Sequence, residues 1–301
     1  MVRTDATPDA ERVPPESVTI TVLCENTAGR PWILGEWGLS LWIEAGGSTI
    51  LLDTGLEHAL AHNAAKLGVD LSRADAVVLS HGHVDHVGGL ETVLTARPGV
   101  PVYLHPDSLL PRWSRMDTVG LEAGRAEPIG MSEQLRAVLE ERAELHFVTG
   151  PTEIAPFVWV TGEIPRREPV EGTGGLGFLD PTLTRPDLLP GDMALWIETQ
   201  AGLLVILGCA HAGVINTLRH IQEVSGDAPI AGVIGGTHLL IAKPERMAAT
   251  IDALKALPLR VLAPCHCTGP KETHELRNAF PDQFAVMSSG SRLVFPPPAA
   301  S

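Results

Sequence analysis

The sequence predicts an α/β protein, and three observations lead to this expectation. Strand-like apolar runs alternate with helix-like stretches along nearly the whole chain. The 301 residues are 44% hydrophobic, which is enough to bury a large core. A group of histidines begins directly where one apolar run, residues 74–79, ends. We therefore expect one compact enzyme with its chemistry at the end of a buried strand.

The individual elements follow from local sequence patterns. The run at 74–79 is rich in β-branched and aliphatic residues, as are strands buried on both faces. A double glycine, Gly46-Gly47, marks a turn between two of the opening strands. Strands are expected at 18–23, 39–43, 49–52, 74–79, 102–105, 144–148, 158–161, 193–198 and 203–207, helices at 57–67, 89–96 and 132–141, and two strand–helix repeats around 230–234 and 260–264.

A single domain is expected at residues 17–296, between a flexible N-terminal tail at 1–16 and a short C-terminal tail at 297–301. The chain contains no long apolar span, and its first residues are polar and contain proline. Its four cysteines are too few and too scattered for a disulfide framework. These features predict a cytoplasmic protein.

Two insertions interrupt this pattern, at about 106–142 and 162–192. The second is rich in Gly and Pro, which is typical of functional lids. Its glycine run, 172–177, neither follows a clear strand nor opens a helix, so a lid is favoured over a phosphate-binding loop. The first insertion carries an apolar group suited to capping a site, formed by Leu109, Leu110, Trp113 and Met116.

The charge of the chain limits its partners. There are 22 basic and 36 acidic residues, and the net charge is −14. Nucleic acids and anionic membranes need a basic footprint, so neither is an expected partner, whereas a small-molecule substrate is. Trp32, Trp37 and Trp42 fit either an apolar homodimer surface or partly buried core and pocket wall. Trp37 is a candidate for the mouth of an active site.

Residues 80–86, Ser-His-Gly-His-Val-Asp-His, are typical of a metal site. Side chains two residues apart in an extended segment share a face, so His81 and His83 are expected to bind one ion. The chain then enters a helix, which directs Asp85 and His86 toward a second ion. Imidazole and carboxylate ligands suit zinc, iron or manganese.

This motif resembles the His-x-His-x-Asp-His hallmark of the metallo-β-lactamase superfamily, and further segments are similar to its motifs in order along the chain. Residues 48–55 resemble the first motif, 203–213 the later strand and metal-binding turn, and 260–269 the final strand with its terminal His. The resemblance implies a four-layer αββα sandwich with two mixed sheets flanked by helices. It also implies a binuclear site for Zn²⁺, with Mn²⁺ or Fe²⁺ as alternatives.

Within the superfamily, three motifs are similar to those of one branch. They are Gly-Cys-Ala-His-Ala-Gly at 208–213, Gly-Gly-Thr-His-Leu at 235–239 and Pro-Cys-His-Cys-Thr-Gly at 264–269. Members of that branch are often labelled as 7,8-dihydropterin-6-ylmethyl-4-(β-D-ribofuranosyl)aminobenzene 5′-phosphate synthase-like proteins. Because a superfamily can host many chemistries, the label does not determine the reaction.

The resemblance also implies roles for single residues. Asp53, which closes its strand, is expected beneath the metals, where it orients the ligands. His266 matches the closing His of the superfamily. Most relatives carry a further His in a Pro-Gly-His-Thr segment, whereas the corresponding residues here, 161–165, include none, so His211 is the candidate that completes the first metal site. Cys209 falls where relatives carry a bridging Asp or a Cys ligand, and it is either a zinc-binding thiolate or a buried thiol.

Two further sets of residues lie near these motifs. His238 is expected to hydrogen-bond a ligand or the substrate, because metal ligands usually need such partners. Cys265 and Cys267 flank His266, and in an extended segment both would face away from it, which favours packing over direct ligation.

The expected activity is hydrolysis of a small ester, lactone, thioester or phosphoester by a metal-bound hydroxide. Asp85 is the expected general base, with Asp53 and His238 as further catalytic candidates. Glu163 and Asp192 border the expected lid and are candidate site carboxylates. Three alternatives stay open: a pterin/arylamine-ribofuranosyl phosphate synthase-like transferase with the phosphate held by Arg166 and Arg167, an iron-dependent redox enzyme, and a non-catalytic, metal-dependent ligand sensor.

Overall fold

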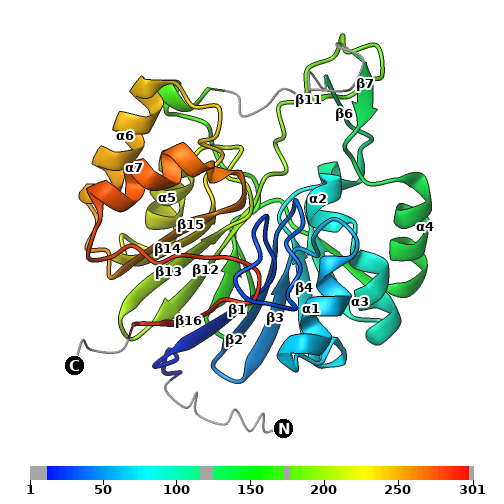
Figure 1. The fold of residues 1–301 in the computed structure, drawn as a ribbon, viewed down its shortest axis with the longest axis horizontal. Coiled ribbons are helices and arrows are strands. Elements are labelled where there is room, and N and C mark those ends of the chain that lie inside the picture. The colour runs from blue at the N-terminus through cyan, green and yellow to red at the C-terminus, as the bar shows by residue number, and fades with distance from the viewer. Residues whose placement is uncertain (1–11, 116–124, 173–176, 298–301) are drawn as a thin grey trace, which may run out of the picture.

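The structure is a computed structural model that describes residues 12–115, 125–172 and 177–297. Two mixed sheets lie face to face, and helices cover the outer face of each sheet (Figure 1). The chain therefore forms four αββα layers, and the expected fold class is confirmed. Met116 and most of the glycine run lie outside the described residues.

Seven strands form the first sheet, in the spatial order β16 (Arg292–Phe295), β1 (Val18–Cys24), β2 (Ser40–Ala45), β3 (Ser48–Leu52), β4 (Ala76–Leu79), β5 (Pro101–Leu104) and β8 (Glu144–Phe147). β1 to β3 form an antiparallel meander, and β3, β4, β5 and β8 are parallel. The turn at Gly46-Gly47 joins β2 to β3, and both glycines have positive φ, which side chains other than glycine rarely adopt.

Six strands form the second sheet, in the spatial order β15 (Val261–Cys265), β14 (Ile230–Gly236), β13 (Gly202–Leu207), β12 (Ala194–Thr199), β10 (Val158–Val160) and β9 (Thr152–Ala155). Neighbours from β9 to β13 are antiparallel, and β13, β14 and β15 are parallel. Each sheet thus has an antiparallel half and a parallel half.

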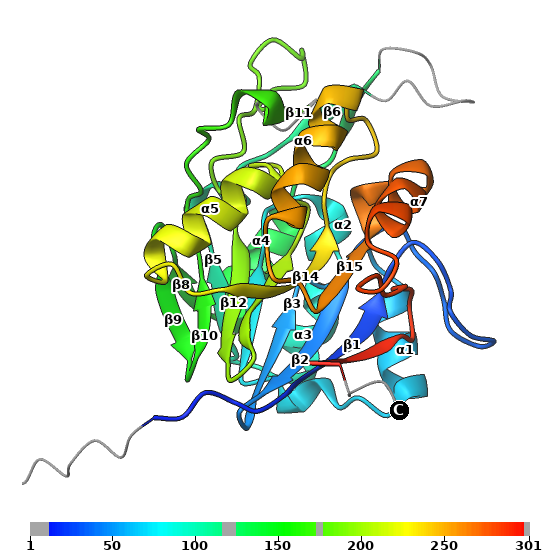
Figure 2. The same ribbon diagram turned by 90° about the vertical axis from the view of Figure 1, so that its left-hand side faces the viewer.

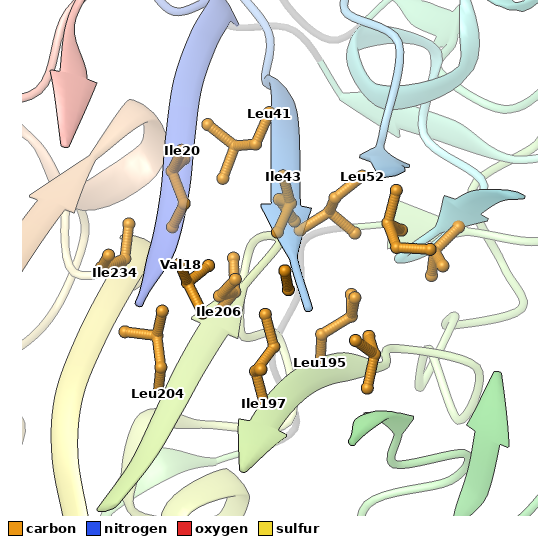
Figure 3. Close-up of a cluster of buried hydrophobic side chains, with 14 of the residues drawn as sticks. Val18, Ile20, Leu41, Ile43, Leu52, Leu195, Ile197, Leu204, Ile206 and Ile234 are labelled. Atoms are coloured by element: carbon orange, nitrogen blue, oxygen red, sulfur yellow. The ribbon is translucent and has the colours of Figure 1, made fainter. Parts of the chain in front are cut away.

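An apolar core lies between the two sheets (Figure 3). Ile20 and Ile43 of the first sheet and Leu195 and Ile206 of the second are fully buried in it. Truncating such a side chain to Ala typically costs about 2–5 kcal/mol of stability. This shared core holds the two sheets against each other.

Helices cover both outer faces, as Figures 1 and 2 show from two sides. Leu60 and Val93 pack with Val77 on the outer face of the first sheet, and Leu218 and Met247 pack with Val233 on that of the second. The helix α5 was not predicted from the sequence. The helices are α1 (Ala59–Leu67), α3 (Leu90–Ala96) and α4 (Glu133–Arg142) on the first sheet, and α5 (Val214–Val224), α6 (Pro244–Lys255) and α7 (Pro270–Ala279) on the second.

The two insertions meet in a third, small sheet that stands above the sandwich in Figure 1. Its strands are β6 (Trp113–Arg115) and β7 (Ala126–Pro128) from the first insertion and β11 (Gly177–Phe178) from the second. β11 pairs with β6 in antiparallel register. Segments that are far apart in the sequence therefore form one unit, which we call the small sheet.

A buried ion pair joins the same two insertions beside the small sheet. Arg112 Nε donates to Asp187 Oδ2 at 2.5 Å, and both residues are almost fully buried. Arg112 also donates to the main-chain carbonyls of Asp107 and Leu110. Breaking such a buried pair from one side typically costs about 3–5 kcal/mol.

The end of the expected N-terminal tail contacts the sandwich. Arg12 is paired with Glu153, and the main-chain N–H of Gln200 donates to the carbonyl of Pro15 at 3.2 Å. The rest of that tail, residues 1–11, lies outside the described residues. No helix in the described part of the chain is long and apolar enough to span a membrane.

Candidate metal centre

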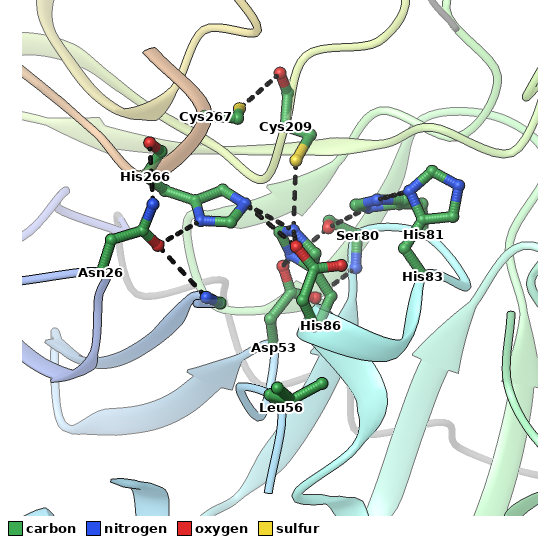
Figure 4. Close-up of polar contacts among 12 residues, drawn as sticks. Asn26, Asp53, Leu56, Ser80, His81, His83, His86, Cys209, His266 and Cys267 are labelled. Carbon is green, nitrogen blue, oxygen red and sulfur yellow. Dashed lines mark hydrogen bonds and ion pairs between the residues drawn. The ribbon is translucent and has the colours of Figure 1, made fainter. Parts of the chain in front are cut away.

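The carboxyl ends of parallel strands from both sheets meet at one edge of the sandwich. His81 follows β4, Cys209 follows β13, His238 follows β14 and His266 follows β15. A single helical turn, α2 (Val84–Val87), carries two more of the side chains that converge there (Figure 4). We call the whole set the donor cluster, and it consists of His81, His83, Asp85, His86, Cys209, His211, His238, His266 and Cys267.

Three histidines lie together on one side of the donor cluster. His81 Nε2 and His83 Nδ1 are 3.0 Å apart. The ring centroid of His211 lies 4.8 Å from that of His81 and 5.0 Å from that of His83. The structure therefore brings His211 to the side of His81 and His83, where residues 161–165 offer no His.

Four donors lie together on the other side. Nε2 of His86 is 3.1 Å from Nε2 of His266 and 3.1 Å from the sulfur of Cys209. Oδ2 of Asp85 lies 3.5 Å from Nε2 of His266 and 3.8 Å from Nε2 of His86. These atoms surround one point between the two sheets.

Asp53 fixes two of the rings from below. It is completely buried, and its Oδ2 accepts hydrogen bonds from His86 Nδ1 and Ser80 Oγ, both at 2.7 Å. His86 Nδ1 therefore carries the proton, and the lone pair of Nε2 points into the cluster. Because the Ser80 hydroxyl donates to Asp53, it accepts from His81 Nδ1 at 3.0 Å. The lone pair of His81 is then also on the inward Nε2.

Asn26 fixes His266 in the same way. Its Nδ2 donates to the carbonyl of His266 at 3.2 Å, so the other amide atom is the oxygen. This Oδ1 accepts from the main-chain N–H of Gly38 at 3.2 Å and from His266 Nδ1 at 3.0 Å. The lone pair of His266 Nε2 therefore faces that of His86 Nε2 at 3.1 Å. Two lone pairs at this distance repel each other unless a metal ion or a proton lies between them, so the donor set fits a metal ion.

The electrostatics of the cluster agree with this conclusion. Burial lowers the pKa of His81 well below its usual value and the pKa of His83 to about 4, so both rings are neutral, as metal ligands must be. Burial also opposes charge on His86, but the carboxylates of Asp53 and Asp85 outweigh it and raise the pKa of His86 to about 9. In the metal-free chain a proton on His86 thus takes the place of a cation.

A cavity of about 210 Å³ opens onto the donor cluster. Its walls are largely apolar and include Ile129, Ile241 and Trp37, whose ring lies 5.9 Å from that of His266. Ser114 of β6 and Gly177 of β11 also line it, so the small sheet forms part of the wall. Both insertions therefore reach the candidate site.

Other residues singled out in the sequence lie away from the cavity. Arg166 donates to two main-chain carbonyls, one of them that of His211 at 2.6 Å, and so supports the turn that carries this histidine. Arg167 is paired with Glu223 on the surface, and Glu163 is exposed. Of the four predicted substrate contacts, Trp37 lines the cavity, whereas Glu163, Arg166 and Arg167 do not.

The prediction that both cysteines beside His266 face away from the cluster is wrong for Cys267. His266 has a φ of 53°, so the chain turns there instead of staying extended. As a result Cys267 lines the cavity, whereas Cys265 packs in the core between the sheets. The sequence alone does not distinguish the two thiols, because their positions depend on the backbone conformation.

Two further residues support the site, Asn26, which the sequence did not single out, and Asp192, a candidate carboxylate. Asn26 lies in the loop after β1, far from every motif, and only the folded chain brings it to His266. Asp192 is buried beside the turn after β13, and its Oδ2 accepts from the main-chain N–H of Ala212 at 2.8 Å. Burial raises the pKa of Asp192 to about 6.

Comparison with known proteins agrees with the motifs. The model of the metallo-beta-lactamase superfamily matches residues 38–266. The 7,8-dihydropterin-6-methyl-4-(beta-D-ribofuranosyl)-aminobenzene-5'-phosphate synthase of Methanocaldococcus jannaschii is 27% identical over 292 residues, which cover 93% of this chain and 97% of the synthase. An uncharacterized protein of the same archaeon is 30% identical over 258 residues, 85% of this chain and 93% of its own.

A solved structure is also similar over nearly the whole chain. It is that of a metal-dependent hydrolase of the beta-lactamase superfamily, with a TM-score of 0.77 and 29% identity, covering 92% of this chain and 98% of the hydrolase. The fold, the order of the motifs and the matched family model lead to one conclusion. The chain belongs to the metallo-β-lactamase superfamily.

Proposed function

We propose that this protein is a metal-dependent hydrolase with a binuclear zinc site that acts on a small molecule. One observation carries the proposal. The inward nitrogens of His86 and His266 lie 3.1 Å apart, and Asp53 and Asn26 keep a lone pair on each of them. A pair of this kind is stable with a metal ion or a proton between its members, and the converging donors around it suit a metal ion.

The ligands divide into two sets. Thiol and imidazole donors together favour zinc, with Mn²⁺ and Fe²⁺ as alternatives. His81, His83 and His211 would hold one ion, and Asp85, His86 and His266 the other, with Cys209 between them.

When bound, two such ions supply an activated water near neutral pH and polarise the scissile bond. Asp85 lines the cavity. Burial alone would raise the pKa of its carboxyl group, but the imidazoles of His86 and His266 outweigh burial and lower it, so the group is ionised and accepts a proton from the attacking water. Asp53 does not touch the substrate; it keeps His86 in the tautomer that binds metal.

The cavity favours an uncharged substrate. Among the described residues that line it, none is Lys or Arg, and Trp37, Ile129 and Ile241 provide apolar walls. An ester, lactone or thioester with an apolar part therefore fits better than an anionic phosphoester.

Metal analysis combined with a substrate panel tests this proposal. Protein purified without chelators is assayed for metal by mass spectrometry and for hydrolysis of lactones, esters, thioesters and phosphodiesters. His83→Ala should lose both metal and activity, whereas His58→Ala, an exposed histidine outside the cluster, should lose neither. Absence of metal from the wild-type protein contradicts the proposal. Stoichiometric iron favours the redox alternative, and bound zinc without turnover favours the ligand sensor.

A second candidate is a transferase resembling the archaeal synthase, and the observation that favours it is similarity over 97% of that enzyme. The test supplies a dihydropterin donor and a ribofuranosylaminobenzene 5′-phosphate and follows the joined product by mass spectrometry. Arg166 and Arg167, the expected phosphate ligands, are bound to protein groups instead, which counts against this candidate.

A further inference from the structure

The donor cluster contains more ligand groups than two metal ions use. The two proposed sets, with Cys209 between them, leave His238 and Cys267 unassigned. Both residues line the cavity beside the other donors.

These two residues form a third set together with Cys209. The sulfur atoms of Cys209 and Cys267 and a ring nitrogen of His238 all lie within 4.8 Å of one another. Both cysteines are buried, and His238 is partly buried. His238 Nδ1 is shielded from solvent and has no hydrogen-bond partner in the described part of the chain. A buried polar atom left unpaired in this way costs free energy.

The backbone is shaped to bring this third set together. His238 has a φ of 47°, in the left-handed region that histidine seldom adopts, and such conformations collect at functional sites. The main-chain N–H of His238 donates to the sulfur of Cys267 at 3.2 Å. A Cβ on Gly236 would lie 2.8 Å from that sulfur, so the missing side chain leaves the space that Cys267 occupies.

We propose that Cys209, His238 and Cys267 bind a third metal ion, and that this ion is zinc. Two thiolates and one imidazole suit zinc or monovalent copper and disfavour magnesium, calcium and manganese, which prefer oxygen ligands. His238 is then a metal ligand and not a hydrogen-bonding partner of the substrate. The inference extends the proposed binuclear site through the shared Cys209 but does not depend on hydrolysis.

Metal stoichiometry tests the third ion. Protein stripped by chelator is reconstituted with zinc, desalted and analysed, and the wild type should hold about three equivalents where a binuclear site alone holds about two. Cys267→Ala and His238→Ala should each lose one equivalent. Cys265→Ala is the matched control, because this buried thiol of the same segment faces the core between the sheets and should leave the stoichiometry unchanged. Reconstitution with manganese should fill the two histidine-rich sets only.

Cobalt substitution gives a readout that is independent of activity. Co²⁺ bound by thiolates absorbs in the near ultraviolet by charge transfer from sulfur, and this band should weaken in Cys267→Ala but not in Cys265→Ala. Identical bands in the wild type and Cys267→Ala, or two zinc equivalents in the wild type, would overturn the third site. Two equivalents together with hydrolysis would overturn the third site alone, whereas no bound metal in any variant would overturn the proposed function as well.

Discussion

Five rings of the donor cluster fall into two groups that differ in how they are held. In the first group the outward nitrogen of each ring makes a hydrogen bond. These rings are His81, His86 and His266, bonded to Ser80, Asp53 and Asn26. In the second group the buried Nε2 of His83 and Nδ1 of His238 have no hydrogen-bond partner among the described residues, and the same holds for Oδ1 of Asp192 beside them.

This difference has a physical consequence. A ring whose outer nitrogen is bonded has one tautomer and one orientation, so little entropy is lost when it takes a metal ion. A ring with an unpaired buried nitrogen gains its missing interaction only when something binds. We therefore expect the rings of the bonded group to be oriented for their metal ions before binding, and those of the unbonded group to be ordered by binding.

The largest effect is expected at Asp53. Asp53→Ala should lower the free energy of unfolding by about 3–5 kcal/mol, because three hydrogen bonds to a fully buried carboxylate are lost and His86 loses its charge partner. Denaturation by urea in the presence of chelator measures this change. Asp75→Ala, at an exposed carboxylate that accepts from Thr49, should change stability by less than about 1 kcal/mol. Equal losses in the two variants would show that Asp53 does not anchor the cluster.

The next effect concerns Asp192 and the dependence of stability on pH. Its pKa is 3.8 for an unperturbed group and about 6 in the folded protein, so the folded state holds its proton longer as the pH rises. Stability is therefore lost between these two values, by about 3 kcal/mol in total, and stays lost above them. In metal-free protein Asp192→Asn should gain stability relative to the wild type from pH 4 to pH 7. A difference between the two proteins that is constant with pH would contradict the shift.

The third effect is on metal affinity and is expected at Asn26. Asn26→Ala frees His266 Nδ1, so the ring can rotate and its inward lone pair is no longer enforced. Removing an outer partner of this type typically weakens metal binding about 10- to 100-fold. Competition with a chromogenic chelator measures the affinity, and unchanged affinity would mean that the hydrogen bond does not orient His266.

The smallest effect is expected at Ser80. Ser80→Ala removes the hydroxyl that joins Asp53 to His81, but the main-chain N–H of residue 80 still donates to Asp53. The loss should be about 1 kcal/mol of stability, with a smaller change in metal affinity than for Asn26→Ala. A larger loss of metal affinity in Ser80→Ala than in Asn26→Ala would show that Ser80 orients its ring more strongly than Asn26 does.

The sequence was sufficient to predict most of the fold, because the core strands are continuous apolar runs and most of the major helices follow regular patterns. It was not sufficient for the small sheet. β6, β7 and β11 are two or three residues long, too short to show a period, and they form only because two distant insertions pair. Such pairing is a property of the tertiary structure and leaves little trace in local composition.

The site shows a similar division. His81, His83, Asp85 and His86 lie in one short motif, and the structure brings them together. The role of Cys267 depended on the left-handed φ of His266, and that of Asn26 on a contact between residues 240 positions apart. Arg166 was predicted to bind a phosphate because of its positive charge. Its partners are instead main-chain carbonyls, which a sequence pattern does not reveal.

The ion pair between Arg112 and Asp187 has a consequence for how the cavity of this protein can be redesigned. The two paired residues lie 75 positions apart in the sequence, one in each insertion. Both insertions contribute to the cavity wall. Replacing one insertion by that of a relative would leave the buried charge in the other insertion without its partner. A chimera with a new cavity wall must therefore exchange both segments together.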